Sequence, residues 1–221
     1  ALPPDRSRLL PVALQCTQRP GPTSPVLLPM DGWAWQMART VVQSADSNQH
    51  GVVEHGTLCH ILMAIVATCM HRTLHPRHPL RVLLAHNLRF TIPLDKLTKS
   101  LFKPGGRTPT IQSPTVDGTL ELSRRGLRGF DWSLRSPPHE FRRRGVESSD
   151  VLPDYPYRDD ALAHWEATLQ FCQKYVRLYY ASDRDVVEDS ELQQFVLELS
   201  SEEAAGQKGI GGAGKSPGEL T

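Results

Sequence analysis

The chain has only four cysteines in 221 residues, and no two of them form a Cys-x-x-Cys pair. They are scattered along the sequence, at Cys16, Cys59, Cys69 and Cys172. This usage excludes a disulfide-stapled secreted scaffold, which needs a dense and regular set of cysteines. A reducing compartment fits best, so we expect a cytoplasmic protein.

Long apolar segments and strong net charge are also missing. The longest apolar run, residues 61–70, has about half the length needed to cross a bilayer, so it predicts a buried helix. The net charge is only +1, from 25 basic and 24 acidic residues. This balance excludes firm electrostatic attachment to an anionic membrane and leaves transient association with a membrane surface open. The arginines of residues 124–144 lack the aromatic-rich pattern of a single-strand binder, so no nucleic-acid partner is expected.

The motifs of several enzyme classes are absent as well. The sequence contains no Gly-x-Ser-x-Gly elbow, no phosphate-binding P-loop and no dinucleotide fingerprint. It also lacks His-Glu-x-x-His, the zinc protease motif, whose two histidines are four residues apart. These absences disfavour α/β-hydrolases, nucleotide-dependent enzymes and zincin proteases.

Histidine is abundant, with nine residues, and three of them are spaced by five: His50, His55 and His60. In an α-helix a step of five residues turns the side chain about 140° away, so neighbouring rings would diverge. A π-helical turn, with hydrogen bonds from residue i to i+5, brings such residues back to nearly one face and is often found at functional sites. The spacing therefore predicts a widened helix that presents imidazole nitrogens.

His55 and His60 are the candidate metal ligands. Imidazole suits zinc, copper, iron and nickel, and two histidines on one helix make a common half of a catalytic metal site. The alternative is that both are ordinary core histidines with satisfied hydrogen bonds. A packing or supporting role is expected for His50.

The periodicity of apolar residues predicts a mainly α fold. Residues 1–30 form an extended, proline-rich lead-in with one strand at 10–15, and residues 31–102 form core helices at 32–44, 49–74, 79–88 and 94–102. Residues 103–118 form a flexible loop, residues 119–200 are helical, with helices at 119–129, 161–181 and 188–200, and residues 201–221 form a flexible tail. The 161–181 helix is the most clearly amphipathic of these, and its apolar stripe consists of Leu162, Trp165, Leu169, Cys172, Val176 and Tyr179.

Over nearly its full length the sequence resembles the animal lipoxygenases, of the arachidonate and epidermal type. The matching pieces keep the family's order and intervals. They are residues 11–15, Ala45-Asp46, the segment from His55 to His60, His78-Pro79-Leu80, Leu83-Leu84, residues 89–92, residues 144–146, residues 157–160 with Trp165, and residues 189–193.

The resemblance implies a non-haem iron dioxygenase that converts polyunsaturated fatty acids and O2 into lipid hydroperoxides. It places His55 and His60 at two iron ligands, on the N-terminal half of a helical catalytic domain. By the same resemblance Arg89 falls where some members meet the substrate carboxylate, and Leu94 and Thr98 fall along the fatty-acid channel. An ordinary structural ion pair is the alternative for Arg89. Thr98 replaces an Ala or Gly that steers stereochemistry, so regiospecificity and stereospecificity do not carry over.

The resemblance also implies that this chain is part of a larger domain. The family's lipid-binding β-barrel and the later iron ligands have no counterpart in the 221 residues. We therefore expect this polypeptide alone to bind iron poorly and to turn over no substrate. The alternative function is a truncated, non-catalytic helical module for lipid binding or protein interaction, with a relic metal site.

Overall fold

The computed structural model describes residues 9–101, 114–203 and 205–211, apart from the side chains of Thr98, Lys99 and Leu101. Its helices are α1 (Gly32–Asn48), η1 (Gln49–Leu62), α2 (Met63–Thr73), α3 (Pro79–Leu88), α4 (Thr91–Leu101), α6 (Val116–Arg128), η2 (Trp132–Leu134), α7 (Pro137–Arg143), α8 (Pro156–Arg177), α9 (Asp183–Glu188) and α10 (Ser190–Ser200). Within the described residues, β pairing is limited to isolated bridges. The mainly α fold is confirmed, but residues 10–15 form no strand, because only Leu14 pairs, with Leu27.

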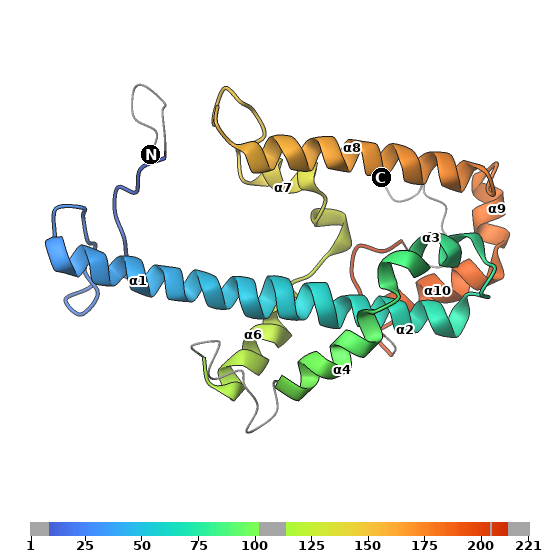
Figure 1. Ribbon diagram of the computed structural model, residues 1–221, viewed down its shortest axis with the longest axis horizontal. Helices are drawn as coiled ribbons and strands as arrows, with labels where there is room; N and C mark the ends of the chain where they lie inside the picture. Colours follow the sequence, from blue (N-terminus) through green and yellow to red (C-terminus); the bar gives the residue numbers. More distant parts are fainter. Residues whose placement is uncertain (1–8, 102–113, 204, 212–221) are drawn as a thin grey trace.

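One continuous helix runs through the molecule, made of α1, η1 and α2 (Figure 1). The helix continues without a break because Gln49 and Met63, at the two junctions, both keep right-handed helical dihedrals. It ends where Leu74 becomes extended, shortly before Pro76. By length and composition alone Gly32–Thr73 is able to cross a membrane, but 56% of its most apolar window is buried inside the protein, as in a core helix.

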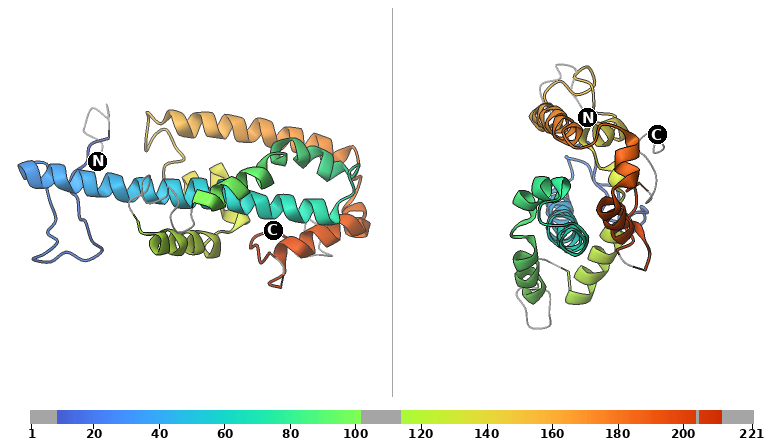
Figure 2. Two further views of the ribbon diagram at one scale, coloured as in Figure 1. Left: turned by 60° about the horizontal axis from the view of Figure 1, so that its bottom comes forward. Right: turned by 90° about the vertical axis from the view of Figure 1, so that its right-hand side faces the viewer.

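Two apolar clusters fasten other helices to this central helix. Val66, Ala67 and Met70 of α2 pack against Leu192, Phe195 and Leu199 of α10. Val53, Leu58 and Leu62 of η1 pack with Phe130, next to α6. Viewed along the central helix, α4, α6 and α10 lie around it, while α8 lies farther out (Figure 2).

Several helices begin earlier than the sequence predicts, and proline explains most of the differences. α4 begins at Thr91 and α8 at Pro156, since the amides of a first turn have no intrahelical acceptor and proline costs nothing there. The pair Pro137-Pro138 likewise starts α7, which the periodicity misses. The predicted last helix, 188–200, corresponds to α10, and the sequence analysis misses α9, which the extended backbone of Asp189 separates from it.

The apolar stripe of α8 is only partly buried in this chain, with Leu162, Trp165, Cys172 and Val176 half-buried. Arg158 is the only buried residue of α8 among the described residues. Leu169 and Tyr179, which belong to the stripe, are exposed. The helix packs mainly on the short α7, and its far end is attached through the Tyr175 hydroxyl, which donates to the Pro79 carbonyl at 3.0 Å.

Candidate metal centre

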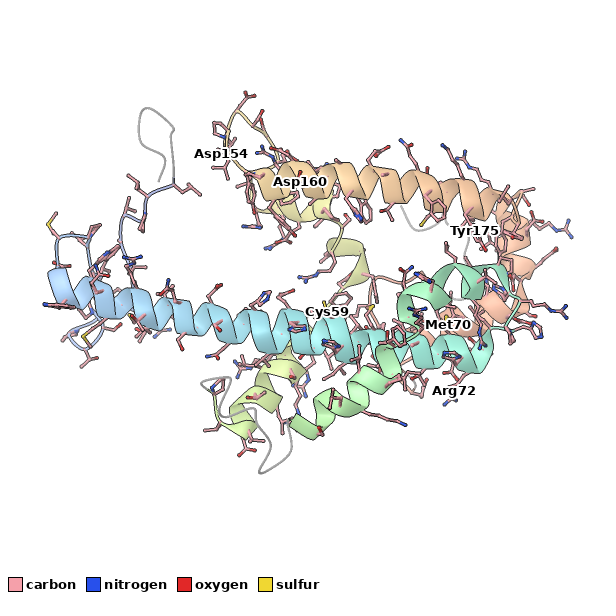
Figure 3. All side chains as sticks on the ribbon, in the orientation of Figure 1. Cys59, Met70, Arg72, Asp154, Asp160 and Tyr175 are labelled. Carbon is pink, nitrogen blue, oxygen red and sulfur yellow. The ribbon has the colours of Figure 1, made fainter. Side chains whose placement is uncertain are left out.

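The two histidines of η1 converge on one another. The Nε2 atoms of His55 and His60 are 3.0 Å apart, and the ring centroids are 4.8 Å apart. This geometry arises because the segment from Gln49 to Leu62 is a π-helix, as the spacing of five predicts. Cys59, labelled in Figure 3, marks this stretch of the central helix.

The separation of the two nitrogens fits a shared metal ion. Imidazole nitrogens bind such ions at about 2.0–2.1 Å, so two of them at a right angle are about 2.9 Å apart. His55 is exposed and His60 half-buried, so both nitrogens are accessible. The same distance fits an N–H···N hydrogen bond, which holds the rings together when no ion is between them. His50, in the first turn of η1, is exposed.

The opposite face of η1 is buried against α6. Thr57 is fully buried, and its Oγ1 lies 2.7 Å from the Val52 carbonyl oxygen and 2.9 Å from Ser123 Oγ of α6. Gly126 of α6 faces Val53 so closely that a Cβ there would lie 2.7 Å from Val53 Cγ1. The absence of a side chain at Gly126 therefore sets how near α6 approaches the helix that carries the histidines.

An ion pair lies beside the site, because Glu54 directly precedes His55 in the sequence. Glu54 accepts a hydrogen bond from Arg135 at 2.5 Å, and the Arg135 guanidinium also lies over the Phe130 ring at 5.6 Å. Both charged side chains are about 40% exposed, so solvent screens their attraction. The pair joins η1 to the turn after η2 and balances the charge of Glu54.

A cavity of about 500 Å³ begins at the residue after His60. The central helix contributes Ile61, Ala64, Ile65, Thr68, Cys69 and Arg72 to its wall, and other parts of the chain contribute Asp95, Glu198, Glu203 and Ala205. Arg72 and Glu198 form an ion pair of 3.0 Å across one end. Burial and the Glu198 carboxylate raise the pKa of the Cys69 thiol, so it remains a neutral part of the wall.

A partly buried set of hydrogen bonds around Asp189 fixes the start of α10, which contributes to this cavity. Asp189 accepts from the Tyr180 hydroxyl at 2.5 Å, from His78 Nε2 at 3.0 Å and from the Leu192 amide at 3.0 Å. The ring proton of His78 is on Nε2, because its Nδ1 accepts from the Leu80 amide. Burial raises the pKa of Asp189, but the three hydrogen bonds outweigh it, so this pKa lies below its usual value.

The residues predicted to bind substrate lie on or just before α4. Arg89 is exposed and its guanidinium stacks 4.3 Å over the Phe90 ring. Leu94 is 43% exposed, and its neighbour Asp95, rather than Leu94 itself, lines the cavity. The side chain of Thr98 lies outside the described residues. A substrate role for these three residues stays a prediction.

The number of possible ligands is limited. Across the described ranges, no group of three or more His, Cys, Asp and Glu side chains is arranged to hold a metal ion.

The supporting residues Thr57, Ser123 and Gly126 were not predicted from the sequence. Only Thr57 gave a signal, as a polar residue inside an otherwise apolar helix face.

Comparisons with known proteins identify the family of this chain. The lipoxygenase family model matches residues 7–209. The linoleate 9/13-lipoxygenase of Pseudomonas aeruginosa is 37% identical over 219 residues, which are 96% of this chain and 32% of that protein. The human polyunsaturated fatty acid lipoxygenase ALOX15B is 35% identical over 205 residues, which are 92% of this chain and 30% of that protein.

Solved structures give the same result for the fold. The crystal structure of coral 8R-lipoxygenase superposes with a TM-score of 0.86 at 27% identity, over 96% of this chain and 33% of that one. A lipoxygenase structure in complex with arachidonate has a TM-score of 0.84 at 25% identity, over 96% of this chain and 32% of that one. The chain thus spans about a third of the length of the relatives it matches. The family model, these relatives and the fold together show that the chain belongs to the lipoxygenase family.

Proposed function

We propose that this chain supplies part of a non-haem iron dioxygenase that acts on polyunsaturated fatty acids. The observation that carries the proposal is the pair of accessible imidazole nitrogens 3.0 Å apart on a π-helix. Family membership supports iron as the metal and a fatty acid as the substrate, since the relatives include enzymes named for linoleate and for polyunsaturated fatty acids.

In this proposal His55 and His60 would hold the iron through Nε2. Bound iron would supply the one-electron chemistry needed to oxidise the methylene between two cis double bonds of a fatty acid, with O2 as the co-substrate that ends up in the hydroperoxide. The protein's own contribution is to fix the two nitrogens and to place the acyl chain beside them. The cavity wall that starts at Ile61 offers an apolar surface of suitable size for part of such a chain.

Two imidazoles alone bind a metal ion weakly. We propose that the remaining ligands of the active enzyme come from outside these 221 residues, and that the chain by itself is catalytically silent. The observation in favour is that His55 and His60 have no third His, Cys, Asp or Glu ligand beside them in the part of the chain that is described. The second candidate function, a non-catalytic lipid-binding or interaction module, rests on the same observation.

A chimaera separates these candidates. Residues 7–209 replace the matching segment of the Pseudomonas aeruginosa linoleate lipoxygenase, and iron content and oxygen uptake with linoleate are measured. We expect bound iron and hydroperoxide formation, both lost in the His55→Gln and His60→Gln versions. A folded chimaera that takes up no iron, or that takes up zinc instead, contradicts the proposed dioxygenase and favours the non-catalytic module.

A further inference from the structure

Thr57 lies between the two histidines in sequence and is fully buried on the opposite face of η1. Its neighbours on that face are apolar, among them Val53 and Leu58. A hydroxyl in such surroundings costs free energy unless it is hydrogen-bonded, so its partners are essential to the structure. Those partners are the Val52 carbonyl oxygen at 2.7 Å and Ser123 Oγ at 2.9 Å.

The direction of these two hydrogen bonds follows from proton counting. A hydroxyl has one proton, and a carbonyl oxygen only accepts, so Thr57 donates to Val52. Ser123 must then donate its own hydroxyl proton to Thr57 Oγ1. The result is a relay from α6 through Thr57 into the backbone of η1.

The relay acts on the wide turn itself. Val52 is five residues before Thr57, so the side chain closes the same i to i+5 interval that defines a π-helix. His55 lies inside this interval and His60 in the turn that follows. Threonines elsewhere in the central helix differ, since Thr68 and Thr73 donate to carbonyls four residues back, as in an ordinary α-helix.

Glycine at position 126 makes the relay possible. Because a Cβ at Gly126 would come within 2.7 Å of Val53 Cγ1, only glycine allows α6 to lie this close to η1. Ser123, one turn earlier on α6, thereby reaches Thr57 directly. Two glycines inside η1 itself, Gly51 and Gly56, give the backbone freedom that an external contact must restrict.

We propose that Thr57 and Ser123 are positioning residues that hold the π-helical turn and so set the distance between the imidazoles of His55 and His60. The metal-binding part of this inference rests on the proposed function. The part that concerns the distance between the two rings in the metal-free protein is independent of the proposed function. The experiment measures the two parts separately.

The experiment uses the full chain with Thr57→Val, Thr57→Ser and Ser123→Ala, and with Thr73→Val as a control of the same chemistry in the α-helical part. Three quantities are measured: the nuclear Overhauser effect between the two imidazole rings without metal, amide hydrogen exchange of residues 52–60, and the affinity for Co²⁺ by calorimetry. Thermal unfolding identifies any variant that does not fold.

For Thr57→Val we expect loss of the ring-to-ring effect, faster exchange in residues 52–60 and at least about tenfold weaker Co²⁺ binding, as for loss of groups that support metal ligands. Thr57→Ser keeps the hydroxyl and should restore all three, while Thr73→Val should change none. If Thr57→Val does not fold, Ser123→Ala, which removes one hydrogen bond only, decides by the same measurements.

The experiment distinguishes a failure of the proposed metal site from a failure of the positioning role. A wild-type chain that binds no Co²⁺ while Thr57→Val still loses the ring-to-ring effect contradicts the proposed metal site but supports the positioning role. A folded Thr57→Val or Ser123→Ala chain that keeps the effect, the exchange pattern and the affinity of the wild type overturns the positioning role.

Discussion

Replacing Gly126 by alanine tests how closely α6 is fitted to the helix that carries the histidines. The added Cβ would lie 2.7 Å from Val53 Cγ1, whereas carbon atoms pack best at about 3.5–4.0 Å. Val53 is buried, and a β-branched side chain in a helix has one strongly preferred rotamer, so it cannot turn away. The two helices must therefore separate by roughly 1 Å.

The expected cost follows from two opposing effects. Overpacking of a well-packed core costs about 1–3 kcal/mol, and replacing glycine inside a helix by alanine returns about 1 kcal/mol of helix propensity. We expect Gly126→Ala to lower the free energy of unfolding by about 1 kcal/mol, measured by urea denaturation followed by circular dichroism. The same shift of α6 should lengthen the 2.9 Å contact between Thr57 and Ser123.

The reasoning is checked by a double-mutant cycle. Val53→Ala removes the atom that the new Cβ meets, so in the Gly126→Ala background it should cost about 1–3 kcal/mol less than in the wild type. Gly118→Ala in the same helix is the matched control, since its Cβ would meet its nearest atoms at 3.3 Å rather than 2.7 Å, and it should lower the free energy of unfolding by less than Gly126→Ala does. Additive effects of Gly126→Ala and Val53→Ala would refute the close contact.

Two further substitutions test the elements around the site. Asp189 has a lower pKa in the folded chain than its ordinary value of 3.8, so its charged form stabilises the fold above that pH and the stabilisation is lost as the pH falls below it. The difference in thermal midpoint between wild type and Asp189→Asn should thus be constant near pH 7 and should narrow as the pH falls below 3.8, and a difference that does not change with pH would contradict this. Arg158 is 2% exposed and donates to the carbonyl oxygens of Val146, Ser148 and Leu152, so Arg158→Met should cost about 2–5 kcal/mol and open residues 144–155 to proteases. Arg143→Met, at an exposed ion pair, is its control and should leave the midpoint unchanged.

The local parts of this structure follow from the sequence. A spacing of five between His55 and His60 is enough to predict the π-helix, because only one regular helix brings such residues to a common face. Runs of apolar residues likewise locate the central helix and α3. These features depend on neighbours within one or two turns, which a single sequence contains.

The features that were missed depend on distant residues. Ser123 contacts Thr57 across 66 positions, and no local pattern connects an isolated serine in α6 with a threonine in η1. The set of hydrogen bonds around Asp189 joins residues more than a hundred positions apart. The apolar stripe of α8 is a real local signal, but its burial depends on partners that the described part of the chain does not place against it.

The accessible pair of imidazoles also determines which ions the isolated chain would capture. A site with two nitrogen donors and several open positions has little geometric selectivity, so its preference follows the general stability order of divalent ions, in which copper, nickel and cobalt exceed ferrous iron. Chain purified over a nickel resin or from copper-rich medium would therefore be loaded with the wrong element. Preparations intended for iron analysis need chelator washing and anaerobic reloading before any stoichiometry is meaningful.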